Sequence, residues 1–384
     1  MELRKFLSPE VLIGEGALAV AGQYAGNFSC QRALLVTDPG VINAGWTAVV
    51  EQSLQKHNIH YTLFSDITSN PRDYEVMNGA EVYKREKCDI IIVVGGGSPM
   101  DCAKGIGIIV SNGGHINDYE GVDRIPVPIP PLICVPTTAG SAADISQFTI
   151  INNTVEKRKI TIISKALVPD VSLIDARVTT TKDNYLTACT AIDTLVHGIE
   201  AYVSNGNSRL SDLNALEAIK LVYENLLLCL NSPQELKYRE ALVTATLMAG
   251  LAFSNASLGI VHAMAHSLGG QFDTFHGETI AILLENAIEY NFEYAEKRYV
   301  HIARALNIDT ETLTPQEIKQ SLVSTLHNFR CNAGLCQTTE KWHFTDNQIN
   351  ILAEKAMLDP CLATNPRPAE HNDIALLYEK AAKQ

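Results

Sequence analysis

The stretch "DIIIVVGGGSPMDCAKGIG" (residues 89–107) joins a run of β-branched residues to three glycines and then to a helical pattern. Short apolar runs of this kind are typical of parallel strands that are covered on both faces. After the glycines, Ser98, Pro99 and Asp101 have the spacing of a helix N-cap, a first-turn proline and a capping-box acid. The stretch therefore predicts a strand, a tight turn and a helix, the repeating unit of an α/β domain.

The rest of the chain divides into two halves with different hydrophobic periods. Similar apolar runs occur at 33–38, 60–66, 131–140 and 171–176, with helical patterns between several of them. From residue 181 onward, apolar residues recur at steps of three and four without strand-like alternation. We therefore expect an α/β domain with a largely parallel sheet over residues 1–178 and an all-helical domain over residues 179–384.

Composition favours an enzyme acting on small molecules. A chain of 384 residues is long enough for two cores. The net charge of −13 argues against a surface that binds nucleic acid or an anionic membrane. The N-terminus lacks the apolar core of a signal peptide, and no apolar run is long enough to span a bilayer, so we expect a cytoplasmic protein.

The nine cysteines are scattered and include no CxxC pair. This pattern predicts reduced, buried thiols rather than a disulfide framework or a zinc finger.

The glycine turn has the features of a phosphate-binding site. Gly95, Gly96 and Gly97 let the backbone come close to a ligand, and the start of the helix near Ser98 supplies free N–H groups. Asp38 ends an earlier strand, where its carboxylate could accept ribose hydroxyls and repel a 2′-phosphate, which favours NAD over NADP. The alternatives are an ordinary tight turn and an ordinary strand-end aspartate.

A third strand end, "PTTAGSAAD" (136–144), is rich in hydroxyls and small residues. It could close the same pocket, or it could be an ordinary strand-to-helix loop.

Two histidine-containing helical patterns suggest a metal site. Asp193 and His197 lie four residues apart, as do His262 and His266, so each pair shares a helix face. We expect the second helix to end at a glycine pair, Gly269-Gly270, and His276 to follow in a short loop. One carboxylate and several imidazoles suit a divalent first-row metal, although spacing alone leaves open which residues bind it and whether they are hydrogen-bonded core residues.

Several motifs together resemble the iron-dependent (group III) alcohol dehydrogenases, a family that includes lactaldehyde reductases and propanediol dehydrogenases. They are "VGGGSPMDCAKGIG", "NP" (70–71), "PTTAGSAAD", "AIDTLVHGIEAY", "AFSNASLGIVHAMAHSLGG", "HGE" (276–278) and "TNPRP" (364–368), in the family's order over essentially the whole chain.

The resemblance implies an NAD-binding α/β domain, a helical metal-binding and catalytic domain, and an active site in the cleft between them. It implies that Fe(II), or alternatively Zn(II), is held by Asp193, His197, His262 and His276. His266 would then be a non-ligand at the reacting centre. Since its unperturbed pKa lies near the working range, it could handle the alcohol proton, or it could only orient neighbouring groups. The implied dinucleotide contacts are Asp38, Asn70, Gly95, Gly96, Gly97, Ser98, Thr137, Thr138, Ser141 and Lys159.

The implied activity is interconversion of a small primary alcohol or diol and its aldehyde by hydride transfer with NAD(H), in a homodimer or larger homo-oligomer. Asp144, Thr190 and Glu278 depart from the usual family pattern, so no particular substrate follows from it. The alternatives are a glycerol-dehydrogenase-like enzyme, a maleylacetate-reductase-like enzyme that needs no metal, and a catalytically silent protein that binds dinucleotide or metal.

Overall fold

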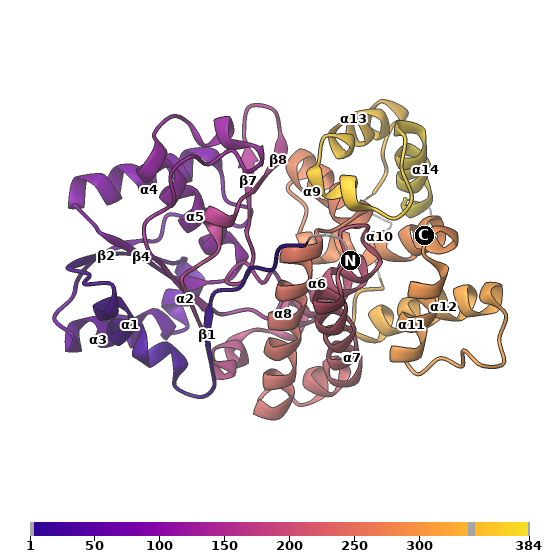
Figure 1. Ribbon diagram of the computed structural model, residues 1–384, viewed down its shortest axis with the longest axis horizontal. Coiled ribbons are helices and arrows are strands. Elements are labelled where there is room, and N and C mark those ends of the chain that lie inside the picture. The colour runs from indigo at the N-terminus through magenta and orange to yellow at the C-terminus, as the bar shows by residue number, and fades with distance from the viewer. Residues whose placement is uncertain (1–3, 337–341, 383–384) are drawn as a thin grey trace. The chain divides into compact units, whose positions relative to one another are not determined.

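A computed structural model describes residues 4–336 and 342–382 (Figure 1). The chain forms two compact units, one of residues 7–182 and the other of the residues from Asp183 onward together with the N-terminus up to Phe6. The fold class expected from the sequence is confirmed. The domain limits of 1–178 and 179–384 stay a prediction.

The first unit is built on a six-stranded sheet in which every neighbouring pair of strands is parallel. Strand β4, the apolar run before the glycines, lies in its interior between β6 and β2. In spatial order the strands are β1 (Glu10–Ile13), β9 (Val171–Ile174), β6 (Leu132–Pro136), β4 (Ile90–Gly95), β2 (Arg32–Val36) and β3 (His60–Phe64).

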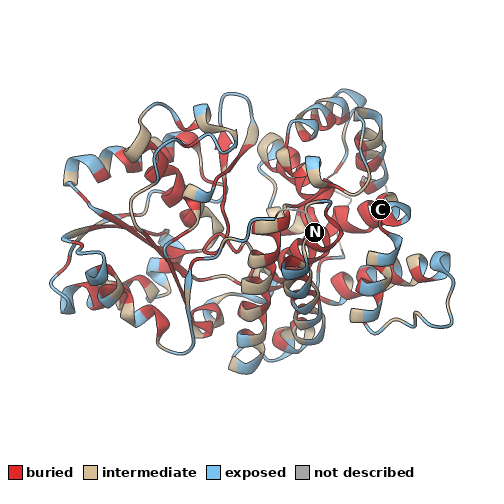
Figure 2. Cartoon of the chain, viewed as in Figure 1, coloured by how far each residue is buried: buried red, intermediate tan, exposed pale blue. Residues whose placement is uncertain are grey.

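Helices cover both faces of this sheet, which is why its strands are apolar on both sides. Ile91 and Val93 of β4 belong to the core beneath α4 (Asp73–Glu86) and α5 (Gly97–Asn112). Ile90, Ile92 and Val94 belong to the core on the opposite face, with α1 (Ala21–Asn27) and α3 (Trp46–Lys56). Figure 2 shows the buried strands between these helices, whose outer faces are exposed.

A second, three-stranded sheet in this unit was not predicted. It contains β5 (Gly121–Val122), β8 (Arg158–Ile163) and β7 (Phe148–Asn153), with β7 and β8 antiparallel. The fully buried Lys104 of α5 donates hydrogen bonds to the Ser146 and Phe148 carbonyls, at 2.6 and 2.8 Å. This buried amine ties α5 to the start of β7.

The second unit is helical, and its described residues from Asp183 onward contain no strand. No described helix alone is long and apolar enough to cross a membrane, although α8 and α9 would meet that test as a pair bent by 99°. The α-helices are α6 (Asn184–Val203), α7 (Arg209–Asn231), α8 (Leu236–Ala256), α9 (Ile260–Phe272), α10 (His276–Asn291), α11 (Glu296–Ala305), α12 (Pro315–Asn332), α13 (Asp346–Met357) and α14 (His371–Ala381).

Two local predictions about helix ends are wrong. Helix α5 begins at Gly97 with Gly96 as its N-cap, so Ser98 lies inside the first turn and does not cap the helix. Helix α9 continues through the glycine pair to Phe272 and ends at Asp273, whose φ of 53° is left-handed. The predicted loop position of His276 is also wrong, because His276 is the first residue of α10.

The prediction of reduced thiols holds for seven of the nine cysteines, all of them free and buried. It is wrong for Cys331 and Cys336, which form a disulfide at the end of α12.

Candidate active site

The glycine turn leaves little room for side chains. A Cβ atom added to Gly96 would lie 3.2 Å from the Thr138 side chain, and one added to Gly97 would lie 3.0 Å from that of Ser141. Bare backbone at the start of α5 is therefore held close to the hydroxyls of "PTTAGSAAD". Free N–H groups at a helix start with no side chains in the way suit a diphosphate.

Two more of the predicted contact residues join this turn through Asn70. The Asn70 backbone N–H donates to Ser98 Oγ at 3.2 Å, and Lys159 Nζ donates to Asn70 Oδ1 at 2.7 Å. Asn70 has a left-handed φ of 57°, a conformation that asparagine tolerates better than most residues. Segments far apart in the sequence thus place an ammonium group, a hydroxyl and a helix N-terminus together within one unit.

Asp38 and Thr137 show two different situations among the predicted cofactor residues. Asp38 follows β2 and caps a short helix, α2 (Pro39–Asn43), accepting a hydrogen bond from the Val41 N–H at 3.0 Å. This cap is the structural role that the sequence left open as an alternative. Thr137 is fully buried, and its hydroxyl has no hydrogen-bond partner among the described residues.

In the helical unit, three imidazoles surround one carboxylate oxygen. Asp193 Oδ1 lies 3.7 Å from His197 Nε2, 3.5 Å from His262 Nε2 and 3.6 Å from His276 Nε2. Ligand atoms of Asp193, His262 and His276 lie within 4.8 Å of one another, a group that does not include His197. The structure thus brings the four residues predicted as metal ligands together around Asp193 Oδ1, with His197 outside the tightest group of three.

These distances fit a metal ion better than hydrogen bonds. Atoms bound tetrahedrally at about 2.1 Å from an ion lie about 3.4 Å apart, whereas good N–H···O hydrogen bonds are shorter than the observed separations. Asp193 Oδ1 and His262 Nε2 are buried and have no hydrogen-bond partner among the described residues. Buried polar atoms without a partner are costly, so a bound cation would explain both atoms.

The electrostatics of the cluster also favour a cation. Burial alone would raise the pKa of Asp193, but His197, His262 and His276 lower it well below its usual range. Burial would lower the pKa of His262, but the Asp193 and Glu200 carboxylates raise it to about 9. The pocket therefore stabilises positive charge at the point where the imidazole nitrogens meet.

Comparisons with known proteins identify the family. The family model described as iron-containing alcohol dehydrogenase matches residues 8–176, and that of the family's C-terminal domain matches residues 187–382. The chain belongs to the iron-containing alcohol dehydrogenase family.

Relatives of this alcohol dehydrogenase align over nearly their whole length. This chain is 35% identical to the 1,3-propanediol dehydrogenase of Citrobacter freundii over 98% of both chains. It is 31% identical to the NAD-dependent methanol dehydrogenase of Bacillus methanolicus over 98% of this chain and 99% of that protein. A solved structure of 1,3-propanediol oxidoreductase matches with a TM-score of 0.94 and 34% identity, covering 99% of this chain and all of that one.

Glu200 is a member of the histidine cluster's surroundings that the sequence reasoning missed. Its carboxylate accepts from His262 Nδ1 at 2.6 Å and from the Gly259 and Val261 N–H groups at 3.0 and 2.7 Å. In the neutral ring that a metal would bind, Nδ1 keeps the proton for Glu200 and the Nε2 lone pair faces Asp193, as metal-binding histidines require. The missed signal was spacing, since Glu200 follows His197 by three residues and so lies near it on α6.

His266 has a different partner from the other histidines. Its Nδ1 donates to Asp359 Oδ2 at 2.8 Å, and its ring stacks against that of His276 with 5.4 Å between centroids. Burial raises the pKa of Asp359, but His266 and the Cys361 N–H lower it to about 2. With Nδ1 committed to a carboxylate, Nε2 is the atom of His266 that can accept a proton.

Gly277 lets the N-terminus of α10 approach α6. A Cβ atom at this position would lie 2.6 Å from the Cys189 carbonyl oxygen and 2.8 Å from Cys189 Cβ. Such distances require something to shift, so only glycine fits beside His276. The close packing brings His276 to Asp193, one turn beyond Cys189 on the same helix.

The three departures from the family pattern lie in different surroundings. Asp144 is buried and accepts from the Ser172 hydroxyl at 2.6 Å, within the α/β unit. Thr190 donates to the Leu186 carbonyl of its own helix at 2.9 Å. Glu278, in the first turn of α10, accepts from the Tyr185 hydroxyl at 3.3 Å.

Proposed function

We propose that this chain is an NAD-dependent, metal-dependent dehydrogenase that interconverts a small primary alcohol or diol and its aldehyde. The observation that carries the proposal is the ring of three imidazole nitrogens 3.5–3.7 Å from Asp193 Oδ1. The names of two relatives, a 1,3-propanediol dehydrogenase and a methanol dehydrogenase, support a short alcohol as the substrate class.

In this proposal Asp193, His197, His262 and His276 hold Fe(II), or alternatively Zn(II). When bound, such an ion supplies Lewis-acid polarisation of the substrate oxygen. His276 is the most exposed of the four, with 26% of its side chain accessible, so it lies on the side that substrate can reach. Glu200 fixes the ring of His262, and Gly277 fixes the position of His276.

His266 is proposed to handle the alcohol proton. Asp359 holds the Nδ1–H of His266 and stabilises the ring when it becomes charged. Nε2 can then take the proton that the alcohol loses and return it in the direction of aldehyde reduction. The alternative within the proposal is that His266 only orients His276 through ring stacking.

The α/β unit is proposed to bind NAD(H), whose nicotinamide carries out the hydride transfer. The diphosphate would lie at Gly95, Gly96, Gly97 and Ser98, with Lys159 and Asn70 beside it, and Asp38 would contact the adenosine ribose. Thr137, Thr138 and Ser141 would contact other parts of the dinucleotide. The relative named as NAD-dependent supports NAD as the cofactor.

The proposal extends to a homodimer or larger homo-oligomer located in the cytoplasm. Likeness to the family supports the assembly, and the negative net charge supports a protein that binds neither nucleic acid nor anionic membrane. Light scattering on the eluted protein and fractionation of cells measure these two properties.

The deciding experiment combines metal analysis of anaerobically purified protein with NADH oxidation by a panel of short aldehydes. We expect one divalent ion per chain and turnover that depends on added Fe(II) or Zn(II). The His262→Ala variant is the control and should lack both. Tight NADH binding without turnover of any aldehyde would contradict the enzyme assignment and favour a silent binding protein.

A further inference from the structure

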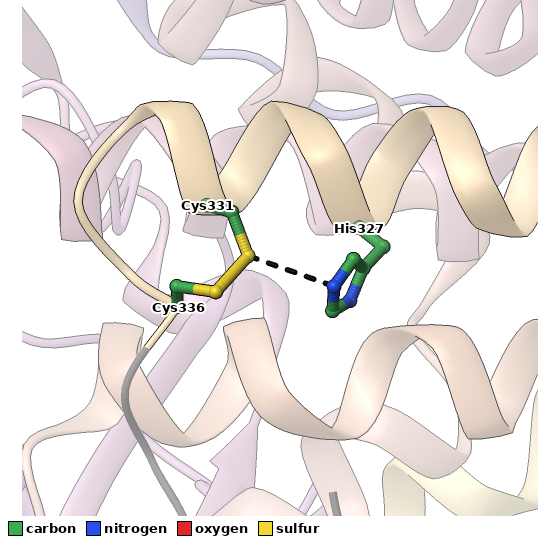
Figure 3. Close-up of side chains that lie close together, drawn as sticks. All are labelled: His327, Cys331 and Cys336. Atoms are coloured by element: carbon green, nitrogen blue, oxygen red, sulfur yellow. Dashed lines mark hydrogen bonds between the residues drawn. A yellow bond between two sulfur atoms is a disulfide. The ribbon is translucent and has the colours of Figure 1, made fainter.

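We propose that Cys331 and Cys336 form a reversible thiol–disulfide exchange site for small thiols and disulfides of the glutathione class. The pair lies at the end of α12, and the dehydrogenase reaction makes no use of it. The two sulfurs are bonded in the structure, with His327 beside them (Figure 3).

The backbone brings the two cysteines together independently of the sulfur bond. At the end of α12 the Gly334 N–H donates to the Cys331 carbonyl at 3.0 Å, and the Leu335 N–H donates to the Arg330 carbonyl at 2.9 Å. Gly334 has a left-handed φ of 86°. This pair of bonds is the Schellman motif, which turns the chain back on the helix and delivers Cys336 to Cys331.

Side-chain hydrogen bonds also stabilise this turn. Leu335 is buried, and its carbonyl accepts from Arg330 Nη1 at 2.8 Å. Arg330 is buried as well and donates through Nε to Glu285 Oε1 at 2.5 Å. Because these contacts do not depend on the disulfide, reduction should leave the two thiols close enough to react again.

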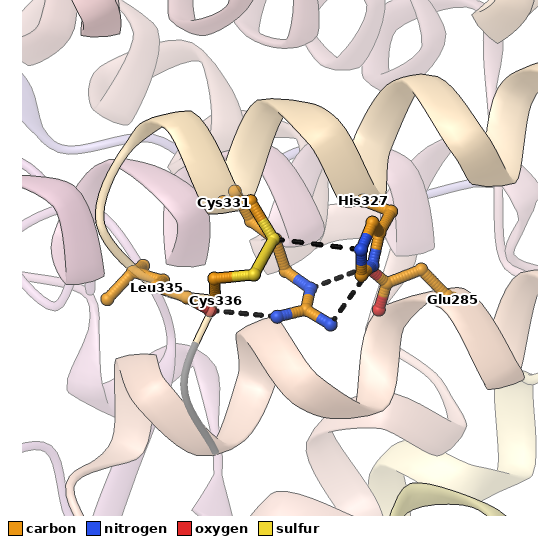
Figure 4. Close-up of a disulfide and its surroundings, with 6 residues drawn as sticks. Glu285, His327, Cys331, Leu335 and Cys336 are labelled. Carbon is orange, nitrogen blue, oxygen red and sulfur yellow. Dashed lines mark hydrogen bonds and ion pairs between the residues drawn. A yellow bond between two sulfur atoms is a disulfide. The ribbon is translucent and has the colours of Figure 1, made fainter. Parts of the chain in front are cut away.

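His327 is placed to activate Cys331. Its Nε2 lies 3.7 Å from Cys331 Sγ, and its Nδ1 lies 3.4 Å from both Glu285 Oε1 and Arg330 Nη2 (Figure 4). Arg330 Nη2 can only donate to Nδ1, so Nε2 carries the ring proton and points it at Cys331 Sγ. In the reduced protein this N–H can donate to the Cys331 thiolate, and stabilising the thiolate raises the reactivity of a cysteine.

Exposure separates this pair from the other cysteines. Cys336 and His327 are exposed and Cys331 is partly exposed, whereas the seven free cysteines are all buried. Reagents in solution can therefore reach the pair without unfolding the protein. Exposed and activated thiols next to a second cysteine are typical of exchangeable disulfides rather than structural ones.

The exchange needs only a small disulfide, RSSR, as the oxidant. The Cys331 thiolate attacks one sulfur of RSSR, which forms a mixed disulfide and releases one thiolate. Cys336 then attacks Cys331 Sγ, which forms the internal disulfide and releases the second thiolate. The two cysteines lose two electrons and two protons, and RSSR becomes two RSH.

The test is alkylation of the native, metal-loaded protein after equilibration with dithiothreitol or with oxidised glutathione, followed by peptide mass spectrometry. We expect both Cys331 and Cys336 to be labelled after dithiothreitol and neither after oxidised glutathione. The seven buried cysteines serve as an internal control and should stay unlabelled in both. Labelling of both residues after oxidised glutathione would overturn the proposal.

Variants separate the roles of the two sulfurs and of His327. Cys336→Ser should accumulate glutathione on Cys331, because the second attack is lost. His327→Gln should slow oxidation by roughly tenfold through loss of thiolate, whereas His60→Gln, an exposed histidine elsewhere, should not change it. An unchanged rate in His327→Gln, or protection of both reduced thiols by added Zn(II), would overturn the assignment, the latter in favour of a metal site.

Discussion

The glycine turn and the histidine cluster build their proposed sites in opposite ways. At Gly95, Gly96 and Gly97 the site consists of backbone, and what matters is that side chains are absent. Around Asp193 the site consists of side-chain atoms from three helices, α6, α9 and α10. The first should therefore fail when atoms are added and the second when atoms are removed, and the two failures should be independent.

The largest effect is expected from removing a side chain of the cluster. His262→Ala takes away one proposed ligand and leaves the buried Glu200 carboxylate without its imidazole partner. Loss of several kcal/mol of Lewis-acid stabilisation corresponds to a rate lower by about a thousandfold or more. Metal analysis measures the loss of the ion, and the rate of aldehyde reduction measures the loss of activity.

The matched control for His262→Ala is NADH binding followed by fluorescence, which should be unchanged. Loss of NADH binding together with the metal would show that the two regions are not independent.

Removing a supporting group should have a smaller effect. Glu200→Gln keeps the shape of the side chain but weakens the hold on His262 Nδ1. Changes to such outer partners reduce metal affinity by about 10- to 100-fold. Competition with a chelator gives the affinity, and a value equal to that of the unsubstituted protein would contradict the positioning role of Glu200.

A site built from side chains should also depend on pH. The folded-state pKa of Asp359 is lowered to about 2 by its contact with His266. Its contribution, about 2 kcal/mol, is present above the unfolded-state pKa near 4 and is lost as pH falls toward 2.

Urea unfolding of Asp359→Asn and the unsubstituted protein tests this pH dependence. The difference in free energy of unfolding should be present at pH 6 and should shrink below pH 4. A difference that is constant over this range would contradict the assignment.

The smallest effect is expected from adding one methyl group to the turn. In Gly97→Ala the new Cβ lies 3.0 Å from the Ser141 side chain, which must give way by a few tenths of an ångström. We expect the KM for NADH to rise by about tenfold as the backbone becomes less accessible to the diphosphate. Metal content should not change, and unchanged NADH kinetics would argue against this turn as the diphosphate site.

The same contrast explains how much the sequence could predict. Short continuous apolar runs identified five of the six strands of the large sheet, and the 3.6-residue period identified the helical second half, because burial imposes those patterns. Spacing of four residues found Asp193, His197 and His262, because residues four apart share one face of a helix. β7 and β8 were missed because their runs, "FTIINN" and "RKITII", mix polar and apolar residues.

What the sequence could not give were contacts that depend on tertiary geometry. A third glycine allowed α5 to begin at Gly97, so the capping pattern at Ser98 was misleading. The partners of His262 and His266 are acids 62 and 93 residues away along the chain. The Cys331–Cys336 bond had a local signal that was overlooked, a glycine after a helix followed by an apolar residue, in "RCNAGLC".

Gly277 has a consequence for ion selectivity. It contributes no donor atom, yet it sets how near the His276 end of α10 comes to α6. The separation between ligands determines the radius of the ion that fits among them. In the proposed metal site Gly277 would act as a spacer that sets the size of the coordination sphere, so a residue with no functional group would take part in choosing the ion.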